Sequence, residues 1–448
     1  MQNSSSDPRR RTLAALLVLA LTVTAAAQQT GSGGTNRPEH LDKPYVILVS
    51  LDGFKAEYLD KFELPNLRAL AQRGAVARRM RPVFPSLTFP NHYSLVTGLE
   101  AARHGIVSNR FYDPARKQTY AYTDNAAVTD GTWYGGEPIW VTAETQGMVA
   151  ACYFWPGSEA AIKGVRPTIY NSYSSDVPNE TRVKTVLEWL QLPAERRPHM
   201  ITLYFSELDT AQHEGPITAP EVEKAAKSLD TVIGTLADGI AKLPIRDRVY
   251  LLLTSDHGMV ETSRAQTVQL ASLLEPADLQ HVAQAFAGPV ANIHVRGGAD
   301  RARQLRDTIN GRLRRGTAYL RDELPERLAH RGNPRSGDLL VVMDEGWTMS
   351  VPRAAAEEAP RAVAPDAAPK PPAPQRPQRE RWGMHGWDPD FPSMQALFLA
   401  VGPTIRPGVI VEEVQNIDVY PFMAELLGLE PAGGIDGRAG RIREAIGK

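Results

Sequence analysis

The sequence predicts an α/β fold with a central, mostly parallel sheet and helices on both faces. Short apolar runs, typical of buried strands, alternate along the chain with longer segments of helical spacing. The runs are apolar throughout and do not alternate with polar residues, which is typical of strands covered on both faces. With 448 residues, 42% of them hydrophobic, the chain can form one large α/β domain or two smaller ones.

The predicted elements follow one another from residue 45 to residue 429. Apolar runs predict strands at 45–54, 148–157, 199–209, 248–258 and 396–402. Helical spacing predicts helices at 65–74, 181–192, 221–243 and 418–429, the first of which ends at Gly74. No internal repeat is present in the sequence. The alternation predicts parallel strands that are joined by helical crossovers.

The first residues have the pattern of a bacterial-type secretory signal peptide. Arg9, Arg10 and Arg11 precede an apolar run and then small residues, with a cleavage point after Ala27. The apolar run is shorter than the roughly 20 residues that a transmembrane span requires. We expect a signal peptide at 1–27, a flexible leader at 28–42 and a periplasmic or secreted protein with no membrane partner after cleavage. An uncleaved N-terminal anchor is the alternative.

The remaining chain, 43–448, is expected to form a single domain. Its Pro- and Ala-rich segment at about 352–380 lacks apolar periodicity and is predicted to be a mobile insertion. The net charge of −1 gives no electrostatic basis for binding duplex nucleic acid or a membrane surface. Cys152 is the only cysteine, which excludes an internal disulfide, and it is expected to be a buried small hydrophobe.

Three aspartates lie at the carboxyl ends of predicted strands: Asp52, Asp209 and Asp256. Ligands of open parallel sheets bind at the carboxyl ends of the strands, so these side chains are expected to converge. His213 follows Asp209 by four residues, and His257 follows Asp256 directly. Because carboxylates at one place repel one another, the cluster indicates a divalent cation, and Asp with His favours zinc.

His385 is the best further ligand candidate. It lies in "GMHGW", where the flanking glycines let the backbone approach a crowded site, although spacing alone leaves a structural role equally open. Six other histidines lack such a setting and are expected to be structural: His92, His104, His199, His281, His294 and His330.

The candidate nucleophile is Thr88 in "VFPSLTFPNHYSLVTG". Pro90 is typical of a first helical turn, which places Thr88 at or just before a helix N-terminus, where anions are favoured. A threonine hydroxyl becomes a strong nucleophile when a metal lowers its pKa. From this stretch alone, a simple helix cap is the favoured role.

Eight motifs occur in order: "SLDGF", "FPSLTFPNHYSLVTG", "HGIVSN", "FWPGSE", "ELDTAQH", "TSDHGM", "DEGW" and "MHGW". Together they resemble the nucleotide pyrophosphatase/phosphodiesterase family, a branch of the alkaline phosphatase superfamily, over residues 45–430. The resemblance implies an alkaline-phosphatase-like fold and hydrolysis of nucleotide phosphodiester and phosphoanhydride bonds, with release of nucleoside 5′-monophosphates.

The same resemblance implies roles for individual residues. Thr88 would be the nucleophile that forms a phosphothreonine intermediate, and Asn109 would bind a non-bridging phosphate oxygen. Phe89 and Tyr173 would sandwich the nucleobase, although both rings could instead simply pack on neighbours. Two zinc ions are implied, one held by Asp52, Asp256, His257 and Thr88, the other by Asp209, His213 and His385.

The sequence departs from the family pattern at two places. "DTAQ" replaces a commoner Ser- and Gly-rich spacer before His213, and the Pro- and Ala-rich insertion is longer than usual. A sulfatase is excluded because Cys152 lacks the required C/S-x-P-x-R setting. A choline or lipid phosphodiesterase, a promiscuous phosphomonoesterase and a non-catalytic secreted metal-binding protein are the alternatives. The physiological nucleotide and the oligomeric state are left open.

Overall fold

The computed structural model describes residues 34–352 and 379–446. The predicted signal peptide, the first part of the leader and nearly all of the Pro- and Ala-rich insertion lie outside the described residues.

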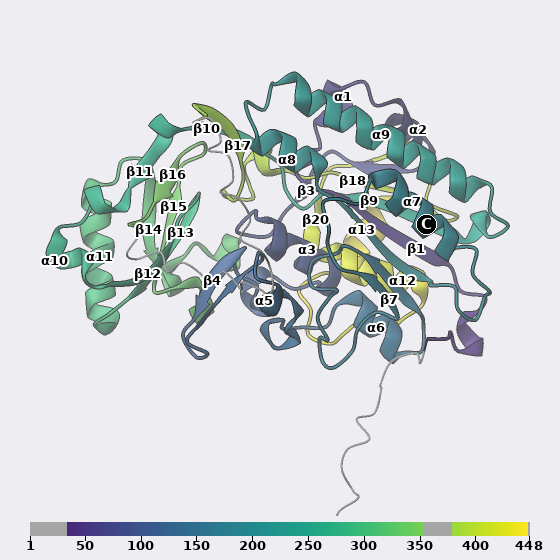
Figure 1. Ribbon diagram of the computed structural model, residues 1–448, viewed down its shortest axis with the longest axis horizontal. Helices are drawn as coiled ribbons and strands as arrows, with labels where there is room; N and C mark the ends of the chain where they lie inside the picture. Colours follow the sequence, from purple (N-terminus) through teal and green to yellow (C-terminus); the bar gives the residue numbers. More distant parts are fainter. Residues whose placement is uncertain (1–33, 353–378, 447–448) are drawn as a thin grey trace, which may run out of the picture.

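An eight-stranded sheet forms the centre of the larger lobe (Figure 1). Five neighbouring strands, from β9 to β7, are mutually parallel, while β18 is antiparallel to both of its neighbours. The predicted mostly parallel sheet is therefore confirmed. In spatial order the strands are β19 (Val409–Val411), β2 (Ala75–Ala77), β18 (Phe398–Val401), β9 (Val249–Thr254), β1 (Tyr45–Leu51), β8 (Met200–Phe205), β6 (Ala150–Tyr153) and β7 (Ile169–Asn171).

Helices cover both faces of this sheet (Figure 1). On one side α9 (Pro220–Ala241) packs on α2 (Pro65–Arg73) and α7 (Asn179–Trp189). On the other side lie α3 (Thr88–Thr97), α6 (Ile139–Thr145) and α12 (Val419–Leu427). The long helix α9 buries residues at alternating steps of three and four, which form the apolar stripe of an amphipathic helix: Val222, Ala226, Leu229, Ile233, Leu236 and Ile240.

A smaller second lobe, which the sequence patterns do not predict, lies at one end of the molecule (Figure 1). Its antiparallel sheet has the order β12 (Val282–Phe286), β13 (Val290–Val295), β15 (Leu339–Met343) and β14 (Gly316–Leu320). One face packs on α11 (Gly298–Arg312), so that Ile293, Leu305, Ile309 and Val341 share a core.

Shorter elements complete the two lobes. They include the hairpin of β4 (Arg110–Asp113) and β5 (Gln118–Ala121), the helices α4 (Ala101–His104), α5 (Asn125–Thr129), α8 (Glu207–His213), α10 (Pro276–Leu279) and α13 (Ala439–Ile446), and the pairs β10 (Val260–Ser263) with β17 (Arg381–Met384) and β11 (Thr267–Gln269) with β16 (Thr348–Ser350). No helix among the described residues is both long and apolar enough to cross a membrane.

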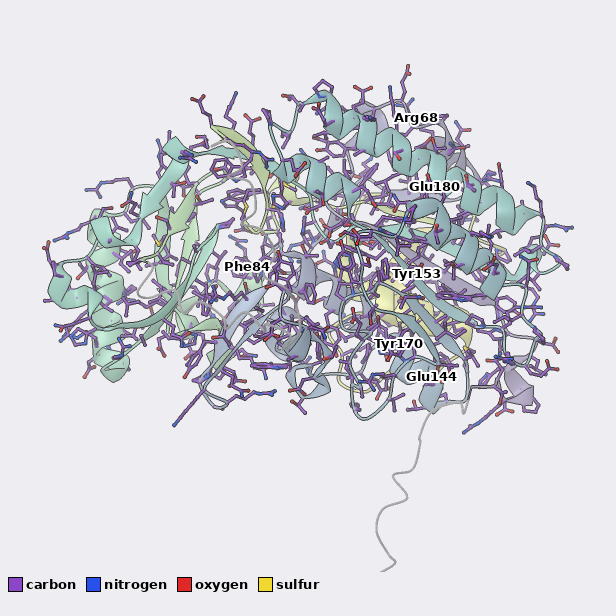
Figure 2. All side chains as sticks on the ribbon, viewed as in Figure 1. Arg68, Phe84, Glu144, Tyr153, Tyr170 and Glu180 are labelled. Atoms are coloured by element: carbon purple, nitrogen blue, oxygen red, sulfur yellow. The ribbon has the colours of Figure 1, made fainter. Side chains whose placement is uncertain are left out.

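The contacts between the second lobe and the larger one include an apolar contact and a set of polar ones. Phe84, in the loop before α3, packs between the lobes on Val290 and Leu340 (Figure 2). The guanidinium of Arg335 donates to Asp113 Oδ2 at 2.8 Å and to the carbonyls of Gly105 and Trp133 at 2.9 and 2.7 Å. The loop before α3 and the β4–β5 hairpin are therefore held by the second lobe.

Most predicted elements exist, with shifted ends. The strand predicted at 199–209 is wrong at its end, because β8 stops at Phe205 and α8 begins at Glu207. Ser206 already has helical backbone angles, so the chain turns as it leaves the sheet. Asp209 therefore lies on a helix, one turn before His213. Cys152 is buried in β6, as expected.

Candidate active site

The three aspartates lie at the carboxyl ends of three adjacent strands. Asp52 directly follows β1, Asp256 comes two residues after β9, and Asp209 lies on α8 beyond β8. Because β1 pairs with both β8 and β9, these side chains meet at the middle of the sheet. Gly53 permits this approach: its φ is +69°, and a Cβ there would lie 3.2 Å from Asp209 Cα.

The first predicted ligand set is assembled around His257. The Nε2 atom of His257 lies 2.9 Å from Asp256 Oδ2 and 3.6 Å from Asp52 Oδ1. Thr88 Oγ1 lies 3.4 Å from the same nitrogen. The structure thus brings together all four side chains that the resemblance assigns to one cation.

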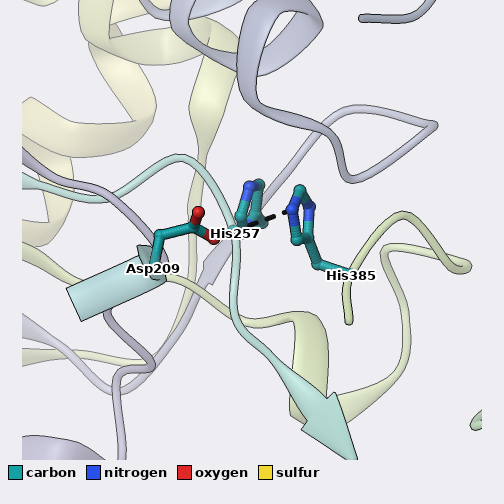
Figure 3. Close-up of side chains that lie close together, drawn as sticks. All are labelled: Asp209, His257 and His385. Carbon is teal, nitrogen blue, oxygen red and sulfur yellow. Dashed lines mark ion pairs between the residues drawn. The ribbon is translucent and has the colours of Figure 1, made fainter. Parts of the chain in front are cut away.

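The second predicted set lies beside the first. Asp209 Oδ1 is 3.3 Å from His213 Nε2 and 3.7 Å from His385 Nε2, and the two histidine nitrogens are 3.1 Å apart. Figure 3 shows Asp209, His257 and His385 pointing toward one another. The rings of His257 and His385 stack with centroids 3.5 Å apart, so His257 adjoins both sets.

The hydrogen bonds of the three histidines determine which ring nitrogen carries the proton. Each Nδ1 lies 2.8–2.9 Å from a backbone carbonyl, which can only accept: those of Gly258, Gly383 and Ser86 for His257, His213 and His385. In the neutral rings each Nε2 is then an acceptor. His213 Nε2 faces His385 Nε2, and His257 Nε2 faces a carboxylate oxygen. Burial opposes protonation of these rings, but the carboxylates of Asp209 and Asp256 raise the pKa of His213 and His257, so that either a metal ion or a proton can lie between the facing atoms.

The buried carboxylates fit the same conclusion. Asp52 Oδ1, Asp209 Oδ1 and Asp256 Oδ2 are buried and receive no hydrogen bond. Burial, together with the carboxylates of Asp256 and Asp209, raises the pKa of Asp52 well above its usual range. Burial lowers the pKa of His385 to about 3, so that this ring is neutral, as a metal ligand must be. Oxygen and imidazole donors of this kind suit zinc.

Thr88 is the first residue of α3, and its side chain does not cap the helix. The N-cap position is Leu87, and Thr88 Oγ1 instead faces His257. Asn91 holds the preceding loop, because its Oδ1 accepts from the Val83 N–H at 2.7 Å and its Nδ2 donates to the Pro85 carbonyl at 3.0 Å. The cap role that this stretch alone favours is therefore wrong.

Asn109 precedes β4 and lies beside the start of α3. Its Oδ1 accepts from the Phe89 N–H at 2.9 Å, which leaves its NH₂ group as the available donor. Pro90 has no N–H, and that of Phe89 is already bonded, so the start of α3 offers few free backbone donors. The binding of a phosphate oxygen by the Asn109 amide stays a prediction.

A cavity of 610 Å³ opens above these residues and includes both predicted base-binding aromatics, Phe89 and Tyr173. Phe89 is partly buried, and Tyr173 is 49% exposed. Tyr122 and Tyr204, which the sequence analysis did not single out, also line the cavity. Tyr122 lies 5.7 Å from Phe89, measured between ring centroids, so the aromatic lining is wider than predicted.

Two further residues contact the predicted ligands without being ligands. The Tyr204 hydroxyl donates to Asp52 Oδ2 at 2.6 Å. His92 Nδ1 lies 2.9 Å from the Thr88 carbonyl and 3.3 Å from Asp256 Oδ2. The spacing of four residues from Thr88 could have indicated His92, which was set aside as structural for lack of flanking glycines.

A central parallel sheet that carries an Asp/His cluster beside a helix-start threonine is the architecture of the alkaline phosphatase superfamily. The model of the type I phosphodiesterase / nucleotide pyrophosphatase family matches residues 46–388, and the chain belongs to this family.

Two sequence relatives of known family agree with this assignment. The chain is 36% identical over 410 residues to human ectonucleotide pyrophosphatase/phosphodiesterase family member 1, covering 88% of this chain and 41% of the relative. It is 35% identical over 425 residues to the venom phosphodiesterase CdcPDE of Crotalus durissus collilineatus, covering 93% of this chain and 48% of the relative. The chain thus spans less than half the length of these relatives.

The solved structure of an inactive murine ectonucleotide pyrophosphatase/phosphodiesterase 5, in complex with AMP, superposes with a TM-score of 0.79 at 26% identity. The match covers 91% of this chain and all of that one. In that protein a threonine is replaced by alanine.

Proposed function

We propose that this protein is a nucleotide pyrophosphatase/phosphodiesterase that releases nucleoside 5′-monophosphates through a phosphothreonine intermediate on Thr88. The observation that carries the proposal is the set of facing acceptors beside Thr88 Oγ1. His213 and His385 place their Nε2 atoms 3.1 Å apart, and His257 Nε2 lies 2.9 Å from a carboxylate oxygen. Buried carboxylates and imidazoles that converge in this way are typical of a metal site.

Two zinc ions fit this donor set. Asp52, Asp256, His257 and Thr88 would hold one ion, and Asp209, His213 and His385 the other. When bound, the ions supply positive charge that lowers the pKa of a coordinated hydroxyl and offsets charge on phosphoryl oxygens.

The chain's own residues then perform a two-step displacement. Thr88 Oγ1 loses its proton to solvent and attacks phosphorus, the new P–O bond forms on threonine, and the bond to the leaving alkoxide or phosphate breaks on the opposite side. Water next attacks the same phosphorus and loses a proton to solvent, the P–O bond to Thr88 breaks, and the threonine oxygen regains a proton. The Asn109 amide donates to an equatorial oxygen whose charge grows in each transition state. The inactive threonine variant of the murine family member 5 supports this role for Thr88.

The cavity supports a nucleotide as the substrate. Phe89 and Tyr173 both line it, and two rings can hold a flat base by stacking. The AMP complex of the murine family member 5 agrees with this substrate class. A choline or lipid phosphodiester and a simple phosphomonoester remain the competing substrates.

We also propose that residues 1–27 form a signal peptide that exports the protein to the periplasm or the exterior. The basic, apolar and small-residue order of this segment supports export. The similar human and snake proteins are named as an ectoenzyme and a venom enzyme.

A substrate panel tests the proposed function. The purified protein should hydrolyse the p-nitrophenyl ester of thymidine 5′-monophosphate faster than bis-p-nitrophenyl phosphate, p-nitrophenyl phosphorylcholine or p-nitrophenyl phosphate. A chelator should abolish the reaction and zinc should restore it. Preference for the choline ester would favour the lipid alternative, and hydrolysis of none of the four would indicate a non-catalytic metal-binding protein.

A further inference from the structure

Tyr204 occupies a place between the metal cluster and the cavity. It is the second-last residue of β8, it is 8% exposed, and it lies in register with Ser50 of the neighbouring strand β1. From there its hydroxyl crosses to the end of β1 and donates to Asp52 Oδ2 at 2.6 Å. This is a short hydrogen bond to a carboxylate that is itself buried.

Because of this hydrogen bond, the two carboxylate oxygens of Asp52 have different surroundings. Oδ2 is occupied by the tyrosine, whereas Oδ1 receives no hydrogen bond and faces His257 Nε2 at 3.6 Å. Asp256 shows the same division: its Oδ1 accepts from the Gly53 N–H at 3.1 Å, and its Oδ2 faces His257. Each carboxylate thus has one oxygen held by the protein and one turned toward the cluster. For Asp52 the holding donor is a side chain, which a substitution can remove.

The tyrosine ring is itself held in place. It packs edge-on against His92 with centroids 5.1 Å apart, and lies 6.1 Å from the ring of Tyr173. The ring is nearly buried, and its contact with His92 together with the hydrogen bond holds the hydroxyl over Asp52.

We propose that Tyr204 is a positioning residue that holds Asp52 with Oδ1 toward the cation and thereby sets the affinity of the site formed by Asp52, Asp256 and His257. The inference rests on the proposed function, because it assumes that this cluster binds metal. Hydrogen-bond partners of metal ligands orient the ligating atom, and losing one typically costs about 10- to 100-fold in metal affinity.

The test measures zinc binding, without substrate, to the metal-free protein by competition with a chromophoric chelator. Tyr204→Phe removes the hydroxyl and keeps the ring. We expect the affinity for one of the two zinc ions to fall about 10- to 100-fold, while the affinity for the other changes less. Tyr420→Phe is the matched control, because it removes a buried tyrosine hydroxyl that bonds to Thr142 at 2.8 Å and to the Ala432 N–H at 2.7 Å. This control should bind both ions as the wild type does.

A double-substitution cycle tests whether Tyr204 acts through Asp52. In an Asp52→Asn background, Tyr204→Phe should cause no further loss of zinc affinity, and a second loss of full size would overturn the proposal. Wild-type affinity in Tyr204→Phe, an equal loss in Tyr420→Phe, or unfolding of the metal-free Tyr204→Phe protein would overturn it as well. A wild-type protein that binds no zinc would instead refute the proposed function.

Discussion

At the scale of single residues, the chemistry depends on where one hydroxyl points. Thr88 begins α3, but its oxygen lies 3.4 Å from His257 Nε2 and makes no capping bond. The loop before it is held by Asn91, whose side chain bonds to the backbone at Val83 and Pro85. The hydroxyl is therefore presented to the cluster by a rigid turn and contributes little to the stability of the helix.

Thr88→Ala should accordingly lower kcat for a nucleotide p-nitrophenyl ester to near background and leave thermal stability almost unchanged, within about 1 kcal/mol. Thr88→Ser retains the hydroxyl and should keep part of the activity. Steady-state kinetics and a thermal melt provide the two measurements. If the alanine variant turned over like the wild type, the covalent mechanism would be wrong.

The aromatic pair should determine the substrate class. If Phe89 and Tyr173 hold a base, then Phe89→Ala and Tyr173→Ala should each lower kcat/KM for a nucleotide p-nitrophenyl ester by about five- to a hundred-fold, since stacking one base contributes about 1–3 kcal/mol. Bis-p-nitrophenyl phosphate has no nucleobase, and its hydrolysis should fall much less. Equal losses on both substrates would argue against a base slot and favour a lipid phosphodiester.

At the scale of elements, the second lobe supports the site from outside. Arg335 reaches from this lobe to the β4–β5 hairpin and bonds to Asp113 and to two backbone carbonyls. Asn109 immediately precedes β4, and Tyr122 immediately follows β5. The hairpin that carries one polar and one aromatic residue of the cavity is thus anchored on the second lobe.

Arg335→Met should therefore destabilise the protein by about 3 kcal/mol, because it leaves the largely buried Asp113 carboxylate without its cation. Denaturant unfolding of the metal-free protein measures this change. Arg303→Met is the control: it removes an arginine of the same lobe that pairs with Asp300 on the surface, and it should change stability little. Similar effects for the two variants would show that Arg335 is no anchor.

The larger sheet could be predicted from the sequence, whereas the second lobe could not. Strands β1, β8 and β9 are uninterrupted apolar runs because helices cover both of their faces. The edge strands β12 and β14 of the second lobe are partly exposed and lack a clear apolar pattern, whereas β13 and β15 are mostly buried runs that the sequence analysis did not assign.

The residues of the candidate site could likewise be predicted only in part from the sequence. The ligand candidates stand out as Asp and His beside strand ends or in motifs, and the structure places them together. Tyr204 contacts Asp52 only across the folded sheet, so no local pattern indicated it, whereas His92 lies four residues after Thr88 on the same helix. Asp209 was assigned to a strand because the apolar run of β8 hides the turn at Ser206.

At the scale of the whole molecule, the Asp/His cluster lies at the carboxyl ends of the three central strands β1, β8 and β9. Asp52 and Asp256 are both almost fully buried there, and each repels the other in the absence of a cation. Two bound ions, one held beside β1, β9 and α3 and the other beside α8, would therefore connect the main elements of the large lobe. Their binding energy should contribute to the stability of the entire fold.

Metal removal should consequently lower the melting temperature as well as the activity. A ligand that binds only the folded state stabilises it by about 2.7 kcal/mol when its free concentration is 100 times its Kd. The melting temperature should therefore rise with the logarithm of the zinc concentration above saturation, and a chelator should reverse the rise. Magnesium, which prefers all-oxygen octahedral sites, should have a much smaller effect on this Asp/His cluster.

His385→Ala should weaken the response of the melting temperature to zinc, because it removes a buried ligand from one set. His330→Ala is the control, because it removes a buried histidine outside the site. This control should lower the melting temperature without changing its dependence on zinc. A melting temperature of the wild type that does not respond to zinc or to chelator would show that the cluster holds no cation in solution.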